Sequence, residues 1–159
     1  MMPLPAHERI NTERGEFPSR VLIVDGEPLI RWSLAVGLRL GGFDTIAAST
    51  GAQAVALAGT SPQPDAILLD LDLFGADPAV LLADLKSVAP DCRFVLMTTG
   101  EGNVFPDGSN TRVIKKPFDL GDVVRVVRSL LDGTLKYYAL SPAGEARGKS
   151  CTNCKNSCK

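Results

Sequence analysis

Residues 65–77 read DAILLDLDLFGAD, and this segment is the strongest indication of the fold in the sequence. Its first part, Ala66 to Leu69, is the most hydrophobic of the strands that the chain predicts, and it ends in Asp70. A short, continuously apolar run that stops at a polar residue is typical of a strand buried on both faces of a parallel sheet. We therefore predict a buried strand that carries the Asp70 carboxylate at its carboxyl end.

Four more strands and four helices are predicted around this segment. Strands are expected at 21–24, 44–48, 93–97 and 112–115. Helices are expected at 28–40, 50–58, 77–86 and from Asp119 to about residue 131. Strands that alternate with helices favour βαβ units, and right-handed crossovers then place helices on both faces of the sheet. We expect an α/β fold with a doubly wound, five-stranded parallel sheet.

The helix at 28–40 has two apolar sides in its sequence. Ile30, Leu34 and Leu38 recur at helical spacing and are expected to face the sheet. A second side carries Trp32, Val36 and Leu40. We expect this second side to pack against a neighbouring helix rather than to form a docking surface.

Polar residues collect where the predicted strands end. Asp25, Asp70, Thr99 and Lys116 each follow an apolar strand, and the carboxyl ends of parallel strands form the edge at which ligands bind. Two neighbouring carboxylates repel each other without a cation, and Mg²⁺ prefers oxygen ligands. Together with an ammonium and a hydroxyl, such carboxylates are suited to receive and neutralise a phosphoryl group.

Four segments in this order make the chain resemble the CheY-like receiver domains of two-component response regulators. The segments are VLIVDGEPLIR (21–31), DAILLDLDLFGAD (65–77), VLMTTG (95–100) and VIKKPFDL (113–120). The resemblance implies a flavodoxin-like fold with strand order 2-1-3-4-5. It also makes Asp70 the phosphoacceptor, with Thr99 as the switch hydroxyl and Lys116 as the phosphate-binding lysine. A cis Lys116–Pro117 bond, a bound Mg²⁺ and a histidine kinase or phosphotransfer protein as partner follow from the same resemblance.

The chain departs from that family at four places. Gly26 stands where the family has a metal-binding acid beside Asp25, so Mg²⁺ is expected to be held weakly or lost unless Glu27 or Asp72 substitutes. The metal ligands expected are therefore Asp25, Asp70, Asp72 through its backbone or side chain, and Glu27 as a possible substitute. Phe74 replaces the usual proline, and Val113 replaces the usual aromatic switch residue. The stretch from Thr99 to Lys116 is short and rich in helix breakers, so we expect the fourth helix to be shortened or absent.

Two functions remain open on this sequence. The first is a response regulator receiver that accepts a phosphoryl group on Asp70 and acts as a substrate rather than as an enzyme with turnover. The second is a pseudo-receiver that serves as a phosphorylation-independent interaction or dimerisation module. A flavodoxin-type enzyme is disfavoured because no glycine-rich phosphate loop follows the first strand.

Composition limits the class of protein. The formal net charge of −1 argues against direct nucleic-acid binding, and 45% hydrophobic residues suffice for a core. No apolar run approaches the roughly 18 residues of a membrane span. The start of the chain lacks the apolar region of a secretory signal, so a cytoplasmic protein is expected.

The ends of the chain are expected to lie outside the domain. We expect a flexible arm at 1–18, the receiver domain at 19–133 and a basic, disordered tail at 134–159, which leaves no room for an effector domain. The sequence is then either a stand-alone receiver or a piece of a longer protein. The tail ends with three cysteines, Cys151, Cys154 and Cys158. We expect a disordered tail, and the alternatives are that these three thiols bind a metal ion or form disulfides.

Overall fold

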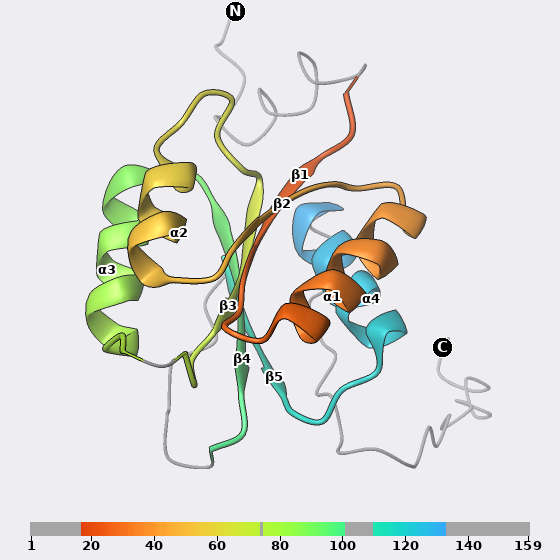
Figure 1. The fold of residues 1–159 in the computed structure, drawn as a ribbon. Coiled ribbons are helices and arrows are strands. Elements are labelled where there is room, and N and C mark those ends of the chain that lie inside the picture. Colours follow the sequence, from red (N-terminus) through yellow and green to blue (C-terminus); the bar gives the residue numbers. More distant parts are fainter. Residues whose placement is uncertain (1–16, 74, 101–109, 133–159) are drawn as a thin grey trace, which may run out of the picture.

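The computed structural model describes residues 17–73, 75–100 and 110–132 (Figure 1). Its five strands are β1 (Arg20–Val24), β2 (Asp44–Ala48), β3 (Ala66–Asp70), β4 (Arg93–Thr98) and β5 (Thr111–Lys115). Its four helices are α1 (Pro28–Leu40), α2 (Gly51–Ala58), α3 (Pro78–Val88) and α4 (Leu120–Asp132). None of the helices in these residues is long and apolar enough to span a membrane.

The sheet has the order β2-β1-β3-β4-β5, and every neighbouring pair is parallel. This confirms the predicted order 2-1-3-4-5. β3 lies at the centre, and all five of its residues are buried. Asp70, its last residue, is level with Met97 of β4 in the register. The predicted central strand is therefore confirmed, with Asp70 at its carboxyl end.

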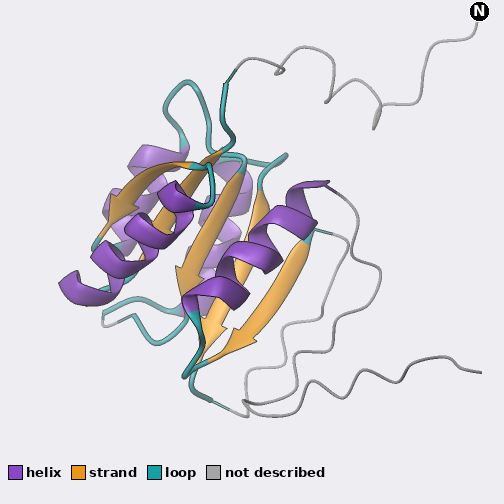
Figure 2. Ribbon diagram, turned by 90° about the vertical axis from the view of Figure 1, so that its right-hand side faces the viewer, coloured by secondary structure: helices purple, strands orange, loops and turns teal. Residues whose placement is uncertain are grey.

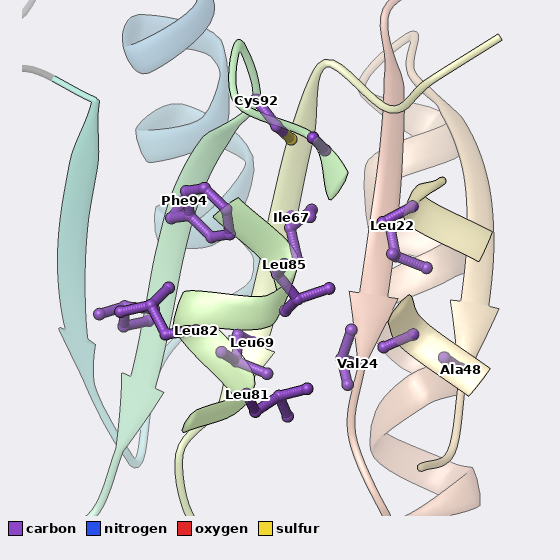
Figure 3. Packing of buried hydrophobic residues seen from close by; sticks show 14 of the residues in the cluster. Leu22, Val24, Ala48, Ile67, Leu69, Leu81, Leu82, Leu85, Cys92 and Phe94 are labelled. Carbon is purple, nitrogen blue, oxygen red and sulfur yellow. The ribbon is translucent and has the colours of Figure 1, made fainter. Parts of the chain in front are cut away.

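Two layers of helices cover the sheet, as Figures 1 and 2 show. α2 and α3 lie on one face, and α1 and α4 lie on the other. The side chains of successive β3 residues point to the two faces of the sheet in turn, because side chains alternate along a strand. Ile67 and Leu69 join the core under α2 and α3, where they lie near Leu85 and Phe94 (Figure 3). Leu68 joins the core under α1 and α4.

Side-chain caps fix where three of the helices begin. The Thr50 hydroxyl accepts a hydrogen bond from the Gln53 amide at 3.2 Å, and Asp77 Oδ1 accepts from the Ala79 amide at 2.9 Å. Asp119 Oδ1 accepts from the Gly121 amide at 2.6 Å. Each of these bonds satisfies an amide that has no partner inside its helix. They hold the helices at the ends of the strands and so shape the loops of the functional edge.

The outward side of α1 is exposed. Leu34 and Leu38 are buried as predicted, but Trp32 is 65% exposed and Leu40 is 86% exposed. The expectation that the second apolar side packs against a helix is therefore wrong for Trp32 and Leu40. The neighbouring helix α4 approaches α1 on a different side, where a Cβ on Gly37 would lie 3.6 Å from Leu120 Cβ.

Several predictions fall outside the described residues. β4 ends at Thr98 and β5 begins at Thr111, so residues 99–110 connect them, and 101–109 of this connection are not described. The prediction of a short or missing fourth helix falls largely on that segment. Phe74, the arm to residue 16 and the tail from residue 133, with its three thiols, also lie outside the described ranges.

Candidate functional site

The predicted polar residues meet at one edge of the sheet. Asp25 follows β1, Asp70 ends β3, Thr99 follows β4, and Lys116 follows β5. These strands are parallel, so their carboxyl ends lie at the same edge. The Lys116–Pro117 bond that follows β5 is cis, as the resemblance implies.

Asp70 is the best-supported carboxylate of this edge. It is 7% exposed, and its Oδ1 accepts hydrogen bonds from Lys116 Nζ at 2.8 Å and from the Asp72 amide at 3.0 Å. Its other oxygen, Oδ2, has no hydrogen-bond donor among the residues that the structure describes. The ion pair with Lys116 fixes the carboxylate and partly neutralises it. One oxygen is thus held by two donors, and the other receives none from the described residues.

The Asp25 carboxylate is buried, and within the described residues only one of its two oxygens accepts a hydrogen bond. Its side chain is fully buried, and Oδ1 accepts from the Glu27 amide at 2.8 Å, while Oδ2 is buried with no hydrogen-bond partner among the residues that the structure describes. Burial raises the pKa of Asp25, and the charges of Asp70 and Glu27 act in the same direction. The Glu27 amide and the Lys116 ammonium oppose this rise. A buried carboxylate oxygen without a donor is a position at which a cation is favourable.

Two carboxylates of this edge fit the oxygen ligands that Mg²⁺ prefers. Mg²⁺ is commonly bound by one or two carboxylates, with water and substrate phosphate completing its shell, and Asp25 and Asp70 supply two carboxylates here. Within the described ranges, no three His, Cys, Asp or Glu residues lie close enough together to form a fuller metal site. Gly26 contributes no side chain. A Cβ built on Gly26 would lie 3.4 Å from Leu73 Cδ1, an ordinary contact, so this position has room for a side chain.

Thr99 contacts Asp72 rather than Asp70. The Thr99 amide and the Thr99 hydroxyl both donate to Asp72 Oδ2, at 2.9 Å and 3.0 Å, and both residues are exposed. Sequence reasoning missed this pair, because Asp72 was considered only as a metal ligand. The pattern of the chain carries no signal for it, since the direction of both side chains is set by loop backbone. Val113, in contrast, is half-buried against the core under α2 and α3.

Comparison with known proteins agrees with this geometry. The family model of the response regulator receiver domain matches residues 21–128. The transcriptional regulatory protein PrrA of Mycobacterium tuberculosis is 32% identical over 124 residues, which cover 75% of this chain and 52% of that protein. The chain thus spans about half the length of this curated relative. Sporulation initiation phosphotransferase F of Bacillus subtilis is 29% identical over 116 residues, which cover 70% of this chain and 93% of that protein.

Solved structures share the fold. A response regulator receiver protein from Sinorhizobium medicae superimposes with a TM-score of 0.63 at 21% identity, covering 72% of this chain and 95% of that one. A CheY-like receiver domain from Methanospirillum hungatei gives a TM-score of 0.61 at 21% identity, with 73% and 95% covered. The sheet order, the carboxylates at its edge and the match over residues 21–128 lead to one conclusion. This chain belongs to the response regulator receiver domain family of two-component systems.

Proposed function

We propose that Asp70 accepts a phosphoryl group from a histidine kinase or a phosphotransfer protein. The observation that carries the proposal is the asymmetry of the Asp70 carboxylate: Lys116 Nζ and the Asp72 amide hold Oδ1, whereas Oδ2 receives no donor from the described residues. The polar edge of a doubly wound sheet is also where such folds bind ligands.

In the transfer, an Asp70 oxygen forms a bond to phosphorus while the phosphorus–nitrogen bond of a phosphohistidine breaks. The imidazole leaves with the electron pair of that bond, and the product on this chain is an acyl phosphate. Lys116, 2.8 Å from Asp70 Oδ1, is placed to neutralise charge on the incoming phosphoryl oxygens. The chain is itself modified in this reaction, so its role is that of a signalling substrate rather than of an enzyme with turnover.

A weakly held Mg²⁺ ion belongs to this proposal. Asp25 and Asp70 would hold it, and water and phosphoryl oxygens would complete its shell in place of the acid that is missing at Gly26, because no third acid of the described residues groups with these two. When bound, the ion supplies positive charge to the phosphoryl oxygens. The Asp25 oxygen that is buried without a donor supports a cation at this place.

The exposed side of α1 is the surface that we assign to the phosphoryl donor protein. Leu29, Trp32 and Leu40 are 71%, 65% and 86% exposed on this helix. α1 begins at Pro28, three residues after Asp25, so the Leu29 end of this surface adjoins the edge that carries the carboxylates, and Leu40 lies at the far end of the helix. A protein donor has to cover this neighbourhood to reach Asp70, and exposed apolar side chains favour such contact.

Incubation with acetyl phosphate and Mg²⁺, followed by intact mass measurement, tests the proposal. We expect a gain of one phosphoryl group, because an Asp70 oxygen displaces acetate from phosphorus. The matched variant Asp70→Asn keeps the size and the fold of the site but should gain none. A folded wild-type chain that gains no phosphoryl group, or an equal gain in Asp70→Asn, contradicts the proposal.

The second candidate is a pseudo-receiver that binds another protein, or a second copy of itself, without phosphorylation. Two observations favour it: Gly26 removes an acid from the metal site, and Val113 is an aliphatic residue half-buried against the core. The same experiment separates the two functions. Absence of labelling in a well-folded chain supports the pseudo-receiver, and labelling that depends on Asp70 supports the receiver. In both cases we propose a cytoplasmic protein.

A further inference from the structure

The turn that carries Asp25 is held by hydrogen bonds from three parts of the chain. The Asp25 amide donates to the Ala48 carbonyl, at the end of β2, at 3.2 Å. Arg31 Nη1, from the first turn of α1, donates to the Asp25 carbonyl at 2.8 Å. The Glu27 amide donates to Asp25 Oδ1 at 2.8 Å. Within the described residues, Oδ2 is thus the only polar atom of Asp25 that has no partner.

Arg31 is bonded to this turn twice. Its backbone amide donates to the Glu27 carbonyl at 3.0 Å, and its side chain reaches further back to the Asp25 carbonyl. The guanidinium therefore lies beside the amino end of α1, where the helix dipole disfavours a cation. The hydrogen bond to Asp25 offsets this cost, because a bond from a charged donor is about twice as strong as one between neutral groups. The Arg31 side chain is thus placed by its contact with Asp25 and not by the helix.

Gly26 makes the bond to the Asp25 carbonyl important. This carbonyl belongs to the peptide that joins Asp25 to Gly26, and glycine restricts its own backbone less than other residues do. Gly26 also has no side chain with which to anchor the turn. The orientation of this peptide therefore depends on the donor that Arg31 supplies.

The charge of Arg31 does not explain its place at the site. Arg31 contacts the backbone carbonyl of Asp25, and the cation that lowers the pKa of the Asp25 carboxyl is Lys116. A guanidinium would also repel a Mg²⁺ ion held by Asp25, because both are positive. A favourable effect of Arg31 on a bound cation must therefore come from geometry.

We propose that Arg31 is a positioning residue: by holding the Asp25 carbonyl, it fixes the turn that presents the Asp25 carboxylate to a cation beside Asp70. The proposal rests on the proposed function of that site. Its consequence is that loss of Arg31 weakens Mg²⁺ binding, although it removes a positive charge. A role by charge alone has the opposite sign, because removal of a neighbouring cation would then strengthen Mg²⁺ binding.

The first test uses amide hydrogen exchange on the full chain without Mg²⁺ or a phosphoryl donor. Arg31→Met keeps a long side chain but lacks the donor. We expect its Glu27 amide to exchange at least about fivefold faster than in the wild-type chain, because the Asp25 acceptor is held less firmly. The Phe94 amide near the start of β4, which donates to the Asn110 carbonyl at 2.8 Å, should be unchanged and reports that the fold is intact. Equal Glu27 exchange in both proteins overturns the proposal.

The second test is calorimetric titration with Mg²⁺. We expect Arg31→Met to raise the Mg²⁺ dissociation constant about three- to tenfold. Arg31→Lys should lie in between, because it keeps a charged donor without the planar fork of arginine. Arg39→Met removes the same charge from an exposed position of α1 and should stay within about twofold of the wild-type chain. An unchanged or lower dissociation constant in Arg31→Met overturns the proposal.

The Mg²⁺ dependence of labelling by acetyl phosphate, read by intact mass, separates positioning from a general loss of structure. Arg31→Met should gain the phosphoryl group more slowly than the wild-type chain at low Mg²⁺ and approach the wild-type rate at saturating Mg²⁺. A rate that stays equally depressed at every Mg²⁺ concentration overturns the proposal, because the defect then lies outside cation binding.

The outcomes distinguish this proposal from the proposed function. Labelling that depends on Asp70, with equal Mg²⁺ affinity in Arg31→Met and the wild-type chain, overturns the role of Arg31 and leaves Asp70 as the acceptor. A wild-type chain that binds no Mg²⁺ also overturns it, because Asp25 then presents its carboxylate to no cation. Absence of labelling in every protein overturns the proposed function. Weaker Mg²⁺ binding and faster Glu27 exchange in Arg31→Met would even then support the role of Arg31 at Asp25.

Discussion

Gly26 is the residue at which we expect the Mg²⁺ affinity of the proposed site to be set. The position has room, since a Cβ there would meet only Leu73 Cδ1 at 3.4 Å. We predict that Gly26→Asp raises Mg²⁺ affinity by about tenfold or more, because it adds a third negative charge beside Asp25 and Asp70. Calorimetric titration with Mg²⁺ measures the effect. It should also appear as a larger rise in melting temperature at a fixed Mg²⁺ concentration.

Gly26→Asn is the matched control for this change, because it has the same shape without the charge. It should bind Mg²⁺ about as weakly as the wild-type chain. Equal Mg²⁺ affinities for the Asp and Asn variants would show that charge at this position does not limit binding.

A second prediction concerns how Asp25 affects the free energy of unfolding at different pH values. Burial and the neighbouring carboxylate raise the pKa of Asp25 above its ordinary value of 3.8, so the folded chain holds the Asp25 proton more tightly than the unfolded chain. Stability from this proton is fully present below pH 3.8 and is lost as the pH rises through the folded pKa. In the absence of divalent cations, Asp25→Asn should therefore be more stable than the wild-type chain at pH 7, by about 1–2 kcal/mol.

Urea denaturation at a series of pH values measures this difference in the free energy of unfolding. The advantage of Asp25→Asn should shrink as the pH falls toward 3.8. Asp84→Asn, which makes the same substitution at an exposed position, is the matched control. A stability gain that does not change with pH would mean that the Asp25 charge is not its cause.

The residues of the site could be predicted from the sequence to different degrees. Asp70 and Lys116 were predictable, because both follow strands that must end at the same edge of the sheet. The hydrogen-bond partner of Thr99 was not predictable, because the identity of a single loop residue does not determine the direction of its side chain. The Asp25 oxygen that has no donor among the described residues could not be predicted either, since its hydrogen bonding depends on where neighbouring donors point.

At the scale of elements, one arginine joins the first residue of β4 to the end of α4. Arg93 Nη1 donates to the carbonyls of Leu130 and Leu131, at 2.7 Å and 2.6 Å. Carbonyls in the last turn of a helix lack intrahelical donors, and a cation there also interacts favourably with the helix dipole. We predict that Arg93→Ala lowers the free energy of unfolding by about 1.5–3 kcal/mol, as measured by urea denaturation.

Two further variants show whether the contact or the charge is responsible. Arg93→Lys keeps the charge but not the paired geometry, so it should recover part of the loss. Arg39→Ala removes an exposed arginine from the last turn of α1 and should change stability by no more than about 0.5 kcal/mol. An equal loss for Arg39→Ala would leave the Arg93 contacts without a special role.

The elements themselves followed from hydrophobic periodicity. Their ends shifted by only one or two residues, as where α3 continues to Val88 and β5 begins at Thr111. The exposure of Trp32 was not predictable in this way, since two apolar sides on one helix predict two neighbours. Which side meets α4 depends on the angle between the helices, and that angle is set by close contacts such as the one at Gly37.

In the molecule as a whole, the sheet separates two cores, and α1 exposes apolar side chains within the part of the chain that the structure describes. The helices of each face are held by their own cluster of buried side chains, and the four apolar residues of β3 each belong to one of the two clusters. Leu29, Trp32 and Leu40 belong to neither cluster and are mostly exposed. Their apolar area therefore does little for the fold, and binding of the phosphoryl donor protein is the role that we propose for it.

The last prediction separates chemistry at Asp70 from recognition on α1. The triple variant Leu29→Gln, Trp32→Gln, Leu40→Gln should gain a phosphoryl group from acetyl phosphate at a rate within about twofold of the wild-type chain, because a small donor does not touch α1. With a histidine kinase that labels the wild-type chain, transfer should slow by about tenfold or more, which corresponds to roughly 1.4 kcal/mol of lost docking energy.

The buried side of the same helix supplies the control for folding. Leu38→Ala, at a fully buried position, should cost about 2–5 kcal/mol of stability, whereas the triple variant should unfold at nearly the urea concentration of the wild-type chain. Equal kinase transfer to the triple variant would place the docking surface elsewhere. An equal slowing with acetyl phosphate would instead show that the α1 surface shapes the Asp70 site itself, because a small donor senses the site and not the surface.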